Sequence, residues 1–211
     1  MPRPQSADSL AGKILKQIRA HRPAHGLKLL SPSDFAALGS RRAVDVALHR
    51  LVDRGALRRV ARGLYYVPHV HPVLGALDPT PEAIAQALAT KHRLRLQPSG
   101  AYAANLLGLS EQVPLRLVYL TDGPNRRMRV GQQEIVFRHT TPRNMATAGR
   151  TSGLVIQALR HLGQRHADQA VVDRLRRRLS DEDRARLADD IPLAPAWIGE
   201  IMRQVAEADA R

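Results

Sequence analysis

The residues best suited to chemistry in this sequence are arginines at the start of a predicted helix. Ser40 can cap a helix that runs to Arg54 and that Gly55 ends. An α-helix fits the major groove of duplex DNA, where Arg41 and Arg42 in the first turn would pair with guanine edges. The candidate DNA-reading residues on this helix are Ser40, Arg41, Arg42, Asp45 and His49.

A second basic group follows on a predicted hairpin. Residues 56–60 and 63–67 are typical of two short strands around a tight turn. Arginines there would meet phosphates or a minor groove, and polar groups before the preceding helix would approach the DNA backbone. The alternative is that these arginines only solvate an exposed surface. The candidates are Arg58, Arg59 and Arg62 on the hairpin, with Lys28, Ser31 and Ser33 near the start of the supporting helix.

Three predicted helices must position these residues. Apolar residues at helical spacing predict a first helix that ends near His21. Ser31 as N-cap, with Pro32 at the first helical position, predicts a second helix that Gly39 ends. Three helices followed by a basic hairpin match the order of a winged helix-turn-helix, which we expect in residues 1–70.

The distribution of charge favours a polyanionic partner. The chain of 211 residues has 33 Lys and Arg against 19 Asp and Glu, a net charge of +14. Residues 1–70 hold +9, residues 71–150 hold +5, and residues 151–211 are neutral. The positive charge therefore accompanies the predicted winged helix and the middle of the chain, as expected for a protein that binds double-stranded DNA.

Composition excludes several classes of site. The sequence contains no cysteine, which excludes disulfides, thiolate metal sites and cysteine nucleophiles. His69 and His71 lack a convincing third ligand, so we predict no metal and no cofactor. No stretch approaches the roughly 18 apolar residues of a membrane span, and residues 1–12 lack the apolar core of a signal peptide. We expect a cytoplasmic protein without membrane contact.

The sequence pattern of the rest of the chain predicts an α+β fold class. Four prolines between Val67 and Pro81 favour a linker, which we place at residues 71–80. Residues 81–211 then form a small α+β domain that ends in a helical bundle. The predicted strands are 94–96, 115–121, 127–130 and 134–138, and the predicted helices are 80–92, 97–108, 152–162 and 168–179, followed by a helix capped by Ser180 and a last helix after Pro195.

A basic run on the later hairpin forms a second candidate surface. It would contact DNA beside the winged-helix site, or an acidic or nucleic-acid-bearing partner. A solvated hairpin face without a partner is the equally open alternative. The residues are Arg126, Arg127, Arg129, Arg138 and Arg143.

No residues form a recognisable catalytic site. There is no compelling Ser-His-Asp order, no phosphate-cradling glycine loop and no carboxylate pair next to a strand end. Asp122 follows a predicted strand, where catalytic groups occur, but Asp122-Gly123 is also a turn signal. We predict no catalytic residue and no enzyme activity. An enzyme that modifies nucleic acid or a partner, and a pure protein-interaction module, are the alternatives.

Several stretches resemble a known family. Residues 51–68, LVDRGALRRVARGLYYVP, look like the winged-helix end of AbiEi-type antitoxin regulators. The motifs LGLSEQVP (107–114), VYLTDGP (118–124) and LVIQAL (154–159) are similar to a bacterial family of unassigned activity that is grouped with these antitoxins of type IV toxin–antitoxin systems. The resemblance covers roughly residues 40–165.

The resemblance implies a regulator bound to its own operon. Its winged helix would bind double-stranded DNA of its promoter at repeated half-sites, and its second domain would counteract a nucleotidyltransferase-like toxin. The family has few assigned functional residues, so the resemblance adds none to the DNA-reading candidates.

Overall fold

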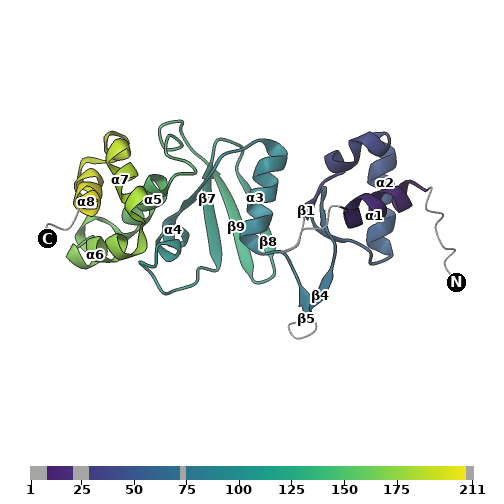
Figure 1. Cartoon of the computed structure of the whole chain (residues 1–211), viewed down its shortest axis with the longest axis horizontal. Coiled ribbons are helices and arrows are strands. Elements are labelled where there is room, and N and C mark those ends of the chain that lie inside the picture. Colours follow the sequence, from purple (N-terminus) through teal and green to yellow (C-terminus); the bar gives the residue numbers. More distant parts are fainter. Residues whose placement is uncertain (1–8, 21–28, 72–74, 208–211) are drawn as a thin grey trace. The chain divides into compact units, whose positions relative to one another are not determined.

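The computed structural model describes residues 9–20, 29–71 and 75–207 (Figure 1). Contacts between residues divide the chain into two compact units, Met1–Lys91 and His92–Arg211. Helices and strands are mixed along the chain, which confirms the predicted α+β class. Lys28, one of the candidate DNA contacts, lies outside the described residues.

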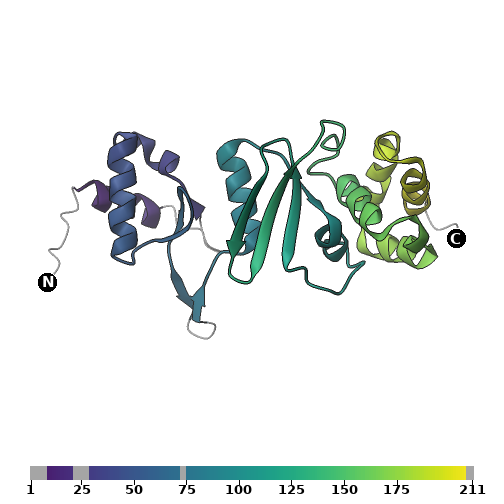
Figure 2. The ribbon, with the colours of Figure 1, turned by 180° about the vertical axis from the view of Figure 1, so that it is seen from behind.

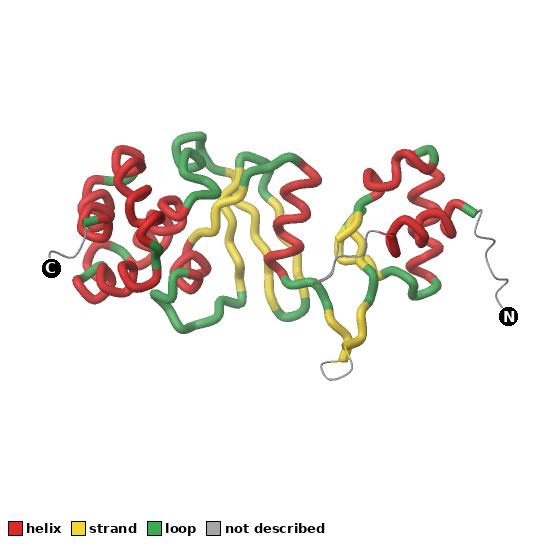
Figure 3. Tube along the Cα trace, in the orientation of Figure 1, coloured by secondary structure: helices red, strands yellow, loops and turns green. Residues whose placement is uncertain are grey.

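The first unit has the element order of a winged helix-turn-helix (Figure 3). A helix-turn-helix precedes a wing of two antiparallel strands, and the strand β1 joins that wing to give the sheet order β1-β3-β2. The elements are α1 (Leu10–Ala20), β1 (Leu29–Leu30), the 3-10 helix η1 (Pro32–Leu38), α2 (Arg41–Asp53), β2 (Arg58–Ala61) and β3 (Leu64–Tyr66).

One apolar cluster holds this unit together. Ile14 of α1, Phe35 of η1, and Leu48 and Leu51 of α2 are almost completely buried within it. Burying side chains of this size contributes about 1.5–3 kcal/mol each, which fixes α2 against the other helices. The opposite face of α2 is thereby left to solvent.

An antiparallel hairpin, β4 (His69–His71) with β5 (Gly75–Leu77), overlaps the linker predicted at residues 71–80. Pro68 and Pro79 flank the two strands, where a missing N–H removes no ladder hydrogen bond. The helix α3 (Pro81–His92) follows. The sequence pattern places α3 in the second domain, whereas contacts group its residues up to Lys91 with the first unit.

The second unit contains a sheet with the strand order β6-β7-β9-β8. Figure 1 labels its strands β7, β9 and β8. The neighbours β7 and β9 are parallel, and the other neighbouring pairs are antiparallel. The predicted hairpin across Gly131 is present as β8 and β9. The strands are β6 (Leu96–Ser99), β7 (Arg116–Thr121), β8 (Arg126–Val130) and β9 (Gln133–His139).

The first of these strands corrects the predicted boundaries. The sequence predicts a strand over 94–96 and a helix from Gln97, but β6 continues to Ser99 and the helix α4 is Gly100–Leu106. Residues 96–99 pair with 118–121 of β7, and this long-range pairing overrides the local helix signal. Pro98 is tolerated because β6 is an edge strand.

Helices gather at the C-terminal end of the second unit (Figure 2). Their apolar faces form one cluster that also takes in Ala103 and Leu107, and the predicted helical third is confirmed. No described helix is long and apolar enough to cross a membrane. The elements are α5 (Thr151–Leu162), η2 (Gln164–His166), α6 (Gln169–Arg178), α7 (Asp181–Asp190), η3 (Ile191–Leu193) and α8 (Ala196–Ala206).

Candidate nucleic-acid interface

The helix α2 presents a polar outer face opposite its buried stripe. The Ser40 hydroxyl accepts a hydrogen bond from the Ala43 N–H at 3.3 Å, which caps the helix as predicted. Because 3.6 residues make one turn, Arg42, Val46 and His49 lie opposite the buried side chains. All three are exposed. This is the face that a recognition helix turns to the major groove.

Arg41 and Asp45 pair with each other on one flank of that face. Arg41 Nε lies 2.9 Å from Asp45 Oδ2, and the side chains are 67% and 46% exposed. An exposed pair of this kind contributes only about 0.3–0.5 kcal/mol. Arg42 has no hydrogen bond or ion pair from its side chain to a described residue. Of the two predicted arginines, Arg42 is therefore the one with every donor available for a base edge.

Val46 is a candidate that the sequence pattern missed. The residue is 45% exposed at the centre of an otherwise polar face. In the major groove, an apolar side chain can contact the methyl group of thymine. The signal was present in the sequence, because Val46 is an apolar residue outside the core stripe of α2.

The turn of the wing is held by a lysine from α3. Lys91 Nζ donates to the carbonyl of Arg62 at 3.1 Å and to that of Gly63 at 2.9 Å. Gly63 has a φ of +66°, the left-handed conformation that such a tight turn requires. The Arg62 side chain is exposed and has no acidic partner among the described residues. The local sequence does not predict this role of Lys91, because Lys91 lies 28 residues after Gly63.

The base of the wing is held by Asp78. The Tyr66 hydroxyl donates to Asp78 Oδ1, and Arg58 Nη1 lies 3.3 Å from the same oxygen. Burial, with the hydrogen bond to Asp78, raises the pKa of Tyr66. The hydrogen bond with Tyr66 raises the pKa of Arg58. Arg58 is thus partnered internally, while Arg59 and Arg62 have no acidic partner among the described residues.

Ser31, a predicted DNA contact, is only 8% exposed and forms hydrogen bonds within the start of η1. Its N–H donates to Asp34 Oδ2 at 2.6 Å, and its hydroxyl lies 2.6 Å from that of Ser33. This arrangement is a capping box that satisfies the N-terminus of η1. Ser33 remains exposed at the same helix start.

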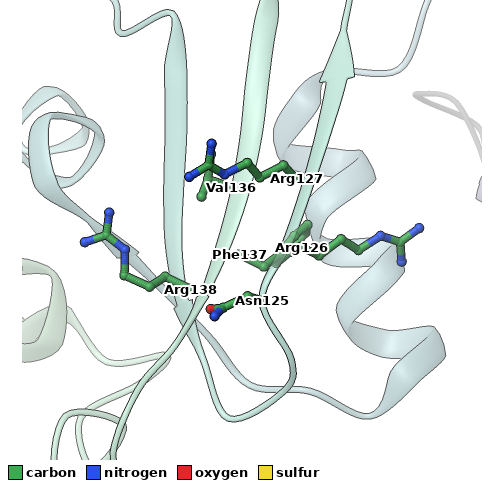
Figure 4. Close-up of a pocket in the computed structure, with 6 residues that line it drawn as sticks. All are labelled: Asn125, Arg126, Arg127, Val136, Phe137 and Arg138. Carbon is green, nitrogen blue, oxygen red and sulfur yellow. The ribbon is translucent and has the colours of Figure 1, made fainter.

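The second basic surface does not lie on one face. Residues paired in register point to the same side of a sheet. Register and alternation place Arg127, Arg129 and Arg138 on one face, whereas Arg126 pairs with Phe137 on the other. Arg127 and Arg138 accordingly point away from Arg126 (Figure 4). Arg143 is exposed in the segment after β9.

Asp122 has a structural role in the second unit. It accepts hydrogen bonds from the backbone N–H and from Nε of Arg95, both at 2.9 Å. These bonds lower the pKa of Asp122 below its ordinary value of 3.8. The carboxylate thereby fixes the turn after β7 to the segment before β6. Among the described residues, no group of three or more His, Asp or Glu could hold a metal ion.

Comparisons with known proteins point to a family and to no activity. A family model with the description "Family of unknown function (DUF6088)" matches residues 13–187. No curated protein matches the chain. Among solved structures, the crystal structure of the RV2827C protein from Mycobacterium tuberculosis is similar, with 18% identity and a TM-score of 0.49. That match covers 95% of this chain and 83% of the other.

Proposed function

We propose that this chain, which belongs to the DUF6088 family, is a sequence-specific DNA-binding transcriptional regulator. The observation that carries the proposal is the exposed outer face of α2 in the recognition position of a winged helix. Arg42 would donate to O6 and N7 of a guanine, Val46 would contact a thymine methyl, and His49 would extend the contact along the groove.

The wing supplies contacts of a different kind. Arg59 and Arg62 would bind phosphates, which set the orientation of the protein on the duplex without reading sequence. The net charge of +9 over residues 1–70 supports this contribution, because phosphate contacts dominate affinity for DNA.

The test compares the promoter region of the chain's own gene with a random duplex of equal length. Arg42→Ala should weaken promoter binding by about 1–3 kcal/mol, roughly 5- to 150-fold, and should barely change binding to random DNA. Arg177→Ala is the matched control, because Arg177 is an exposed arginine on α6 with no side-chain partner among the described residues. Equal affinity of the wild-type chain for promoter and random duplexes would refute the proposal.

The finer part of the proposal is that the regulator is an antitoxin of a type IV toxin–antitoxin system. It would repress its own operon at repeated half-sites, act in the cytoplasm, and counteract a nucleotidyltransferase-like toxin through its second unit without being an enzyme itself. The motifs of residues 107–159 support this part through their family resemblance. We expect this chain to rescue growth when it is expressed together with a nucleotidyltransferase-like protein encoded beside it. Absence of rescue counts against the antitoxin role.

A specific observation also favours a protein partner for the second unit. Val113 and Leu115 are 74% and 70% exposed on the loop between α4 and β7. Asn105 Nδ2 donates to the carbonyls of Ser110 and Gln112 at 3.2 and 3.1 Å, which fixes that loop. Exposed apolar side chains on a fixed loop are typical of protein-binding surfaces.

A double variant of this loop tests the hypothesis that the second unit binds a protein partner. Val113→Asp with Leu115→Asp should abolish the rescue of growth, whereas Arg42→Ala should retain it, since counteracting the toxin would not need DNA. Full rescue by the double variant would exclude this loop as the surface through which the second unit counteracts the toxin.

A further inference from the structure

Helix α5 covers the β6 end of one face of the sheet in the second unit. At the β6 end, the Ser99 hydroxyl donates to Gln157 Oε1 of α5 at 3.2 Å. The helix approaches so closely that a Cβ on Gly153 would lie 2.3 Å from Gln97 Oε1. Gln97 shares this face with Leu120 and Arg138 through the strand register. The same face is therefore closed by α5 at β6 and carries exposed arginines at β8 and β9.

The open end holds a local excess of positive charge. Arg127, Arg129 and Arg138 are exposed, and none of their side chains has a hydrogen bond or ion pair to a described residue. Glu134 of β9 lies opposite Arg129 of β8 and Arg116 of β7 in the strand register. Its carboxylate forms an ion pair with Arg116, with 2.7 Å between Oε2 and Nε. Three guanidinium groups are thus left to bind an external anion.

A shallow cavity gathers donors at this end of the face (Figure 4). The cavity is lined by six residues, of which Arg127, Val136 and Arg138 belong to this face by the strand register. The full lining is Asn125, Arg126, Arg127, Val136, Phe137 and Arg138. Asn125 Oδ1 accepts from the His139 N–H at 2.7 Å, which leaves the Asn125 amide group as a donor. Guanidinium and amide donors without a carboxylate in the lining match the oxygens of a phosphate.

We propose that Arg127, Arg129 and Arg138 bind backbone phosphates of duplex DNA, an inference that rests on the proposed function. Arg127 and Arg129 are two residues apart on β8, about 6.8 Å along the strand, so they form a row suited to successive phosphates and not a cage for one anion. Single-stranded nucleic acid is usually bound by stacking on aromatic rings. Tyr119 and Phe137 belong to the opposite, buried face of the sheet, and no described aromatic side chain is exposed beside the arginines.

The experiment measures how DNA affinity depends on salt for the full chain. The variant replaces three arginines together, Arg127→Gln, Arg129→Gln and Arg138→Gln. The matched control replaces Arg174, Arg177 and Arg178 of α6 with Gln, which removes the same charge from exposed positions of the same unit. Each protein is titrated with the promoter duplex, a random duplex, single-stranded DNA and duplex RNA, and thermal unfolding verifies that both variants fold.

Each phosphate contact contributes about 0.9 to the slope of log K against log salt concentration. We expect the slope for both DNA duplexes to fall by about 2.7 in the variant and to stay unchanged in the control. Over a fourfold rise in salt, the variant should therefore lose about 40-fold less affinity than the wild type. Arg127→Gln alone should lower the slope by about 0.9, which tests the proposal should the triple variant unfold.

A slope equal to that of the wild type, or an equal decrease in the control, would overturn the proposal. A decrease seen with duplex RNA or single-stranded DNA and absent with duplex DNA would overturn the choice of duplex DNA as the ligand. The proposed function fails separately, because it requires a preference for the promoter over random DNA, whereas the sheet arginines should act on both duplexes alike.

Discussion

Lys91 should set the position of the wing turn, although it lies far from the predicted recognition residues. Replacing it with methionine keeps a long side chain and removes the ammonium group. We expect Lys91→Met to weaken DNA binding because the wing turn loses its support, while the α2 face remains as it is. Lys91→Arg keeps the charge and the donors and should bind almost as well as the wild type.

The magnitude follows from two hydrogen bonds. Lys91 Nζ donates to the Arg62 and Gly63 carbonyls at 3.1 and 2.9 Å, and each such bond contributes about 1 kcal/mol net. About 2 kcal/mol therefore holds the turn in place. If the whole amount is needed to order the turn on DNA, the affinity falls by up to about 30-fold.

A double-mutant cycle distinguishes this mechanism from general damage to the fold. Lys91→Met, Arg62→Ala and the double variant are compared with the wild type on one promoter duplex. Lys91 acts through the position of Arg62, so the double variant should bind about as weakly as the weaker single variant. Additive losses would refute the reasoning, since they would mean that Lys91 acts independently of the wing arginine.

Three further predictions concern stability. Asp122→Asn should lower the melting temperature at neutral pH. Because folding lowers the pKa of Asp122, its carboxylate stabilises the fold above the ordinary value of 3.8, and this stabilisation is lost as pH falls through the folded pKa. A difference in melting temperature between wild type and variant that persisted in stronger acid would contradict this reasoning. Ser31→Ala should cost about 1 kcal/mol in denaturant unfolding and leave DNA affinity unchanged, whereas a selective loss of affinity would show that Ser31 contacts DNA. Gly153→Ala should destabilise the fold by about 1–3 kcal/mol or more, because the new Cβ would lie 2.3 Å from the Thr147 carbonyl oxygen. Gly39→Ala is the control and should be close to neutral, because the nearest atom to its new Cβ would be 3.6 Å away.

The winged helix could be predicted because its signals are local. Ser40 and Gly55 mark the ends of α2 within one stretch of chain, and the spacing of its apolar residues identifies the buried side. The strand β1 could not be found in this way. It consists of Leu29 and Leu30, and it exists only because it pairs with β3 more than thirty residues later.

The sequence predicts part of the candidate site, as it does for the fold. Alternation along β8 predicts that Arg127 and Arg129 share a face, but Arg138 joins them only through the register between β8 and β9. The sequence identifies Ser31 as a polar residue at a helix start without showing that the fold buries it. Roles of this kind depend on contacts between distant segments, which local patterns do not contain.

The parallel pairing of β7 with β9 has a consequence for how the second unit folds. The chain reaches β9 only by passing through β8, and β8 pairs with β9 across a turn at Gly131. Hairpins form within microseconds, and parallel pairs must first close a longer loop. The β8–β9 hairpin should therefore form early and serve as the template on which β7 docks, with closure of β7 against β9 as the slower step. Substitutions in the hairpin turn should accordingly slow folding, while those at the β6 edge should mainly speed unfolding.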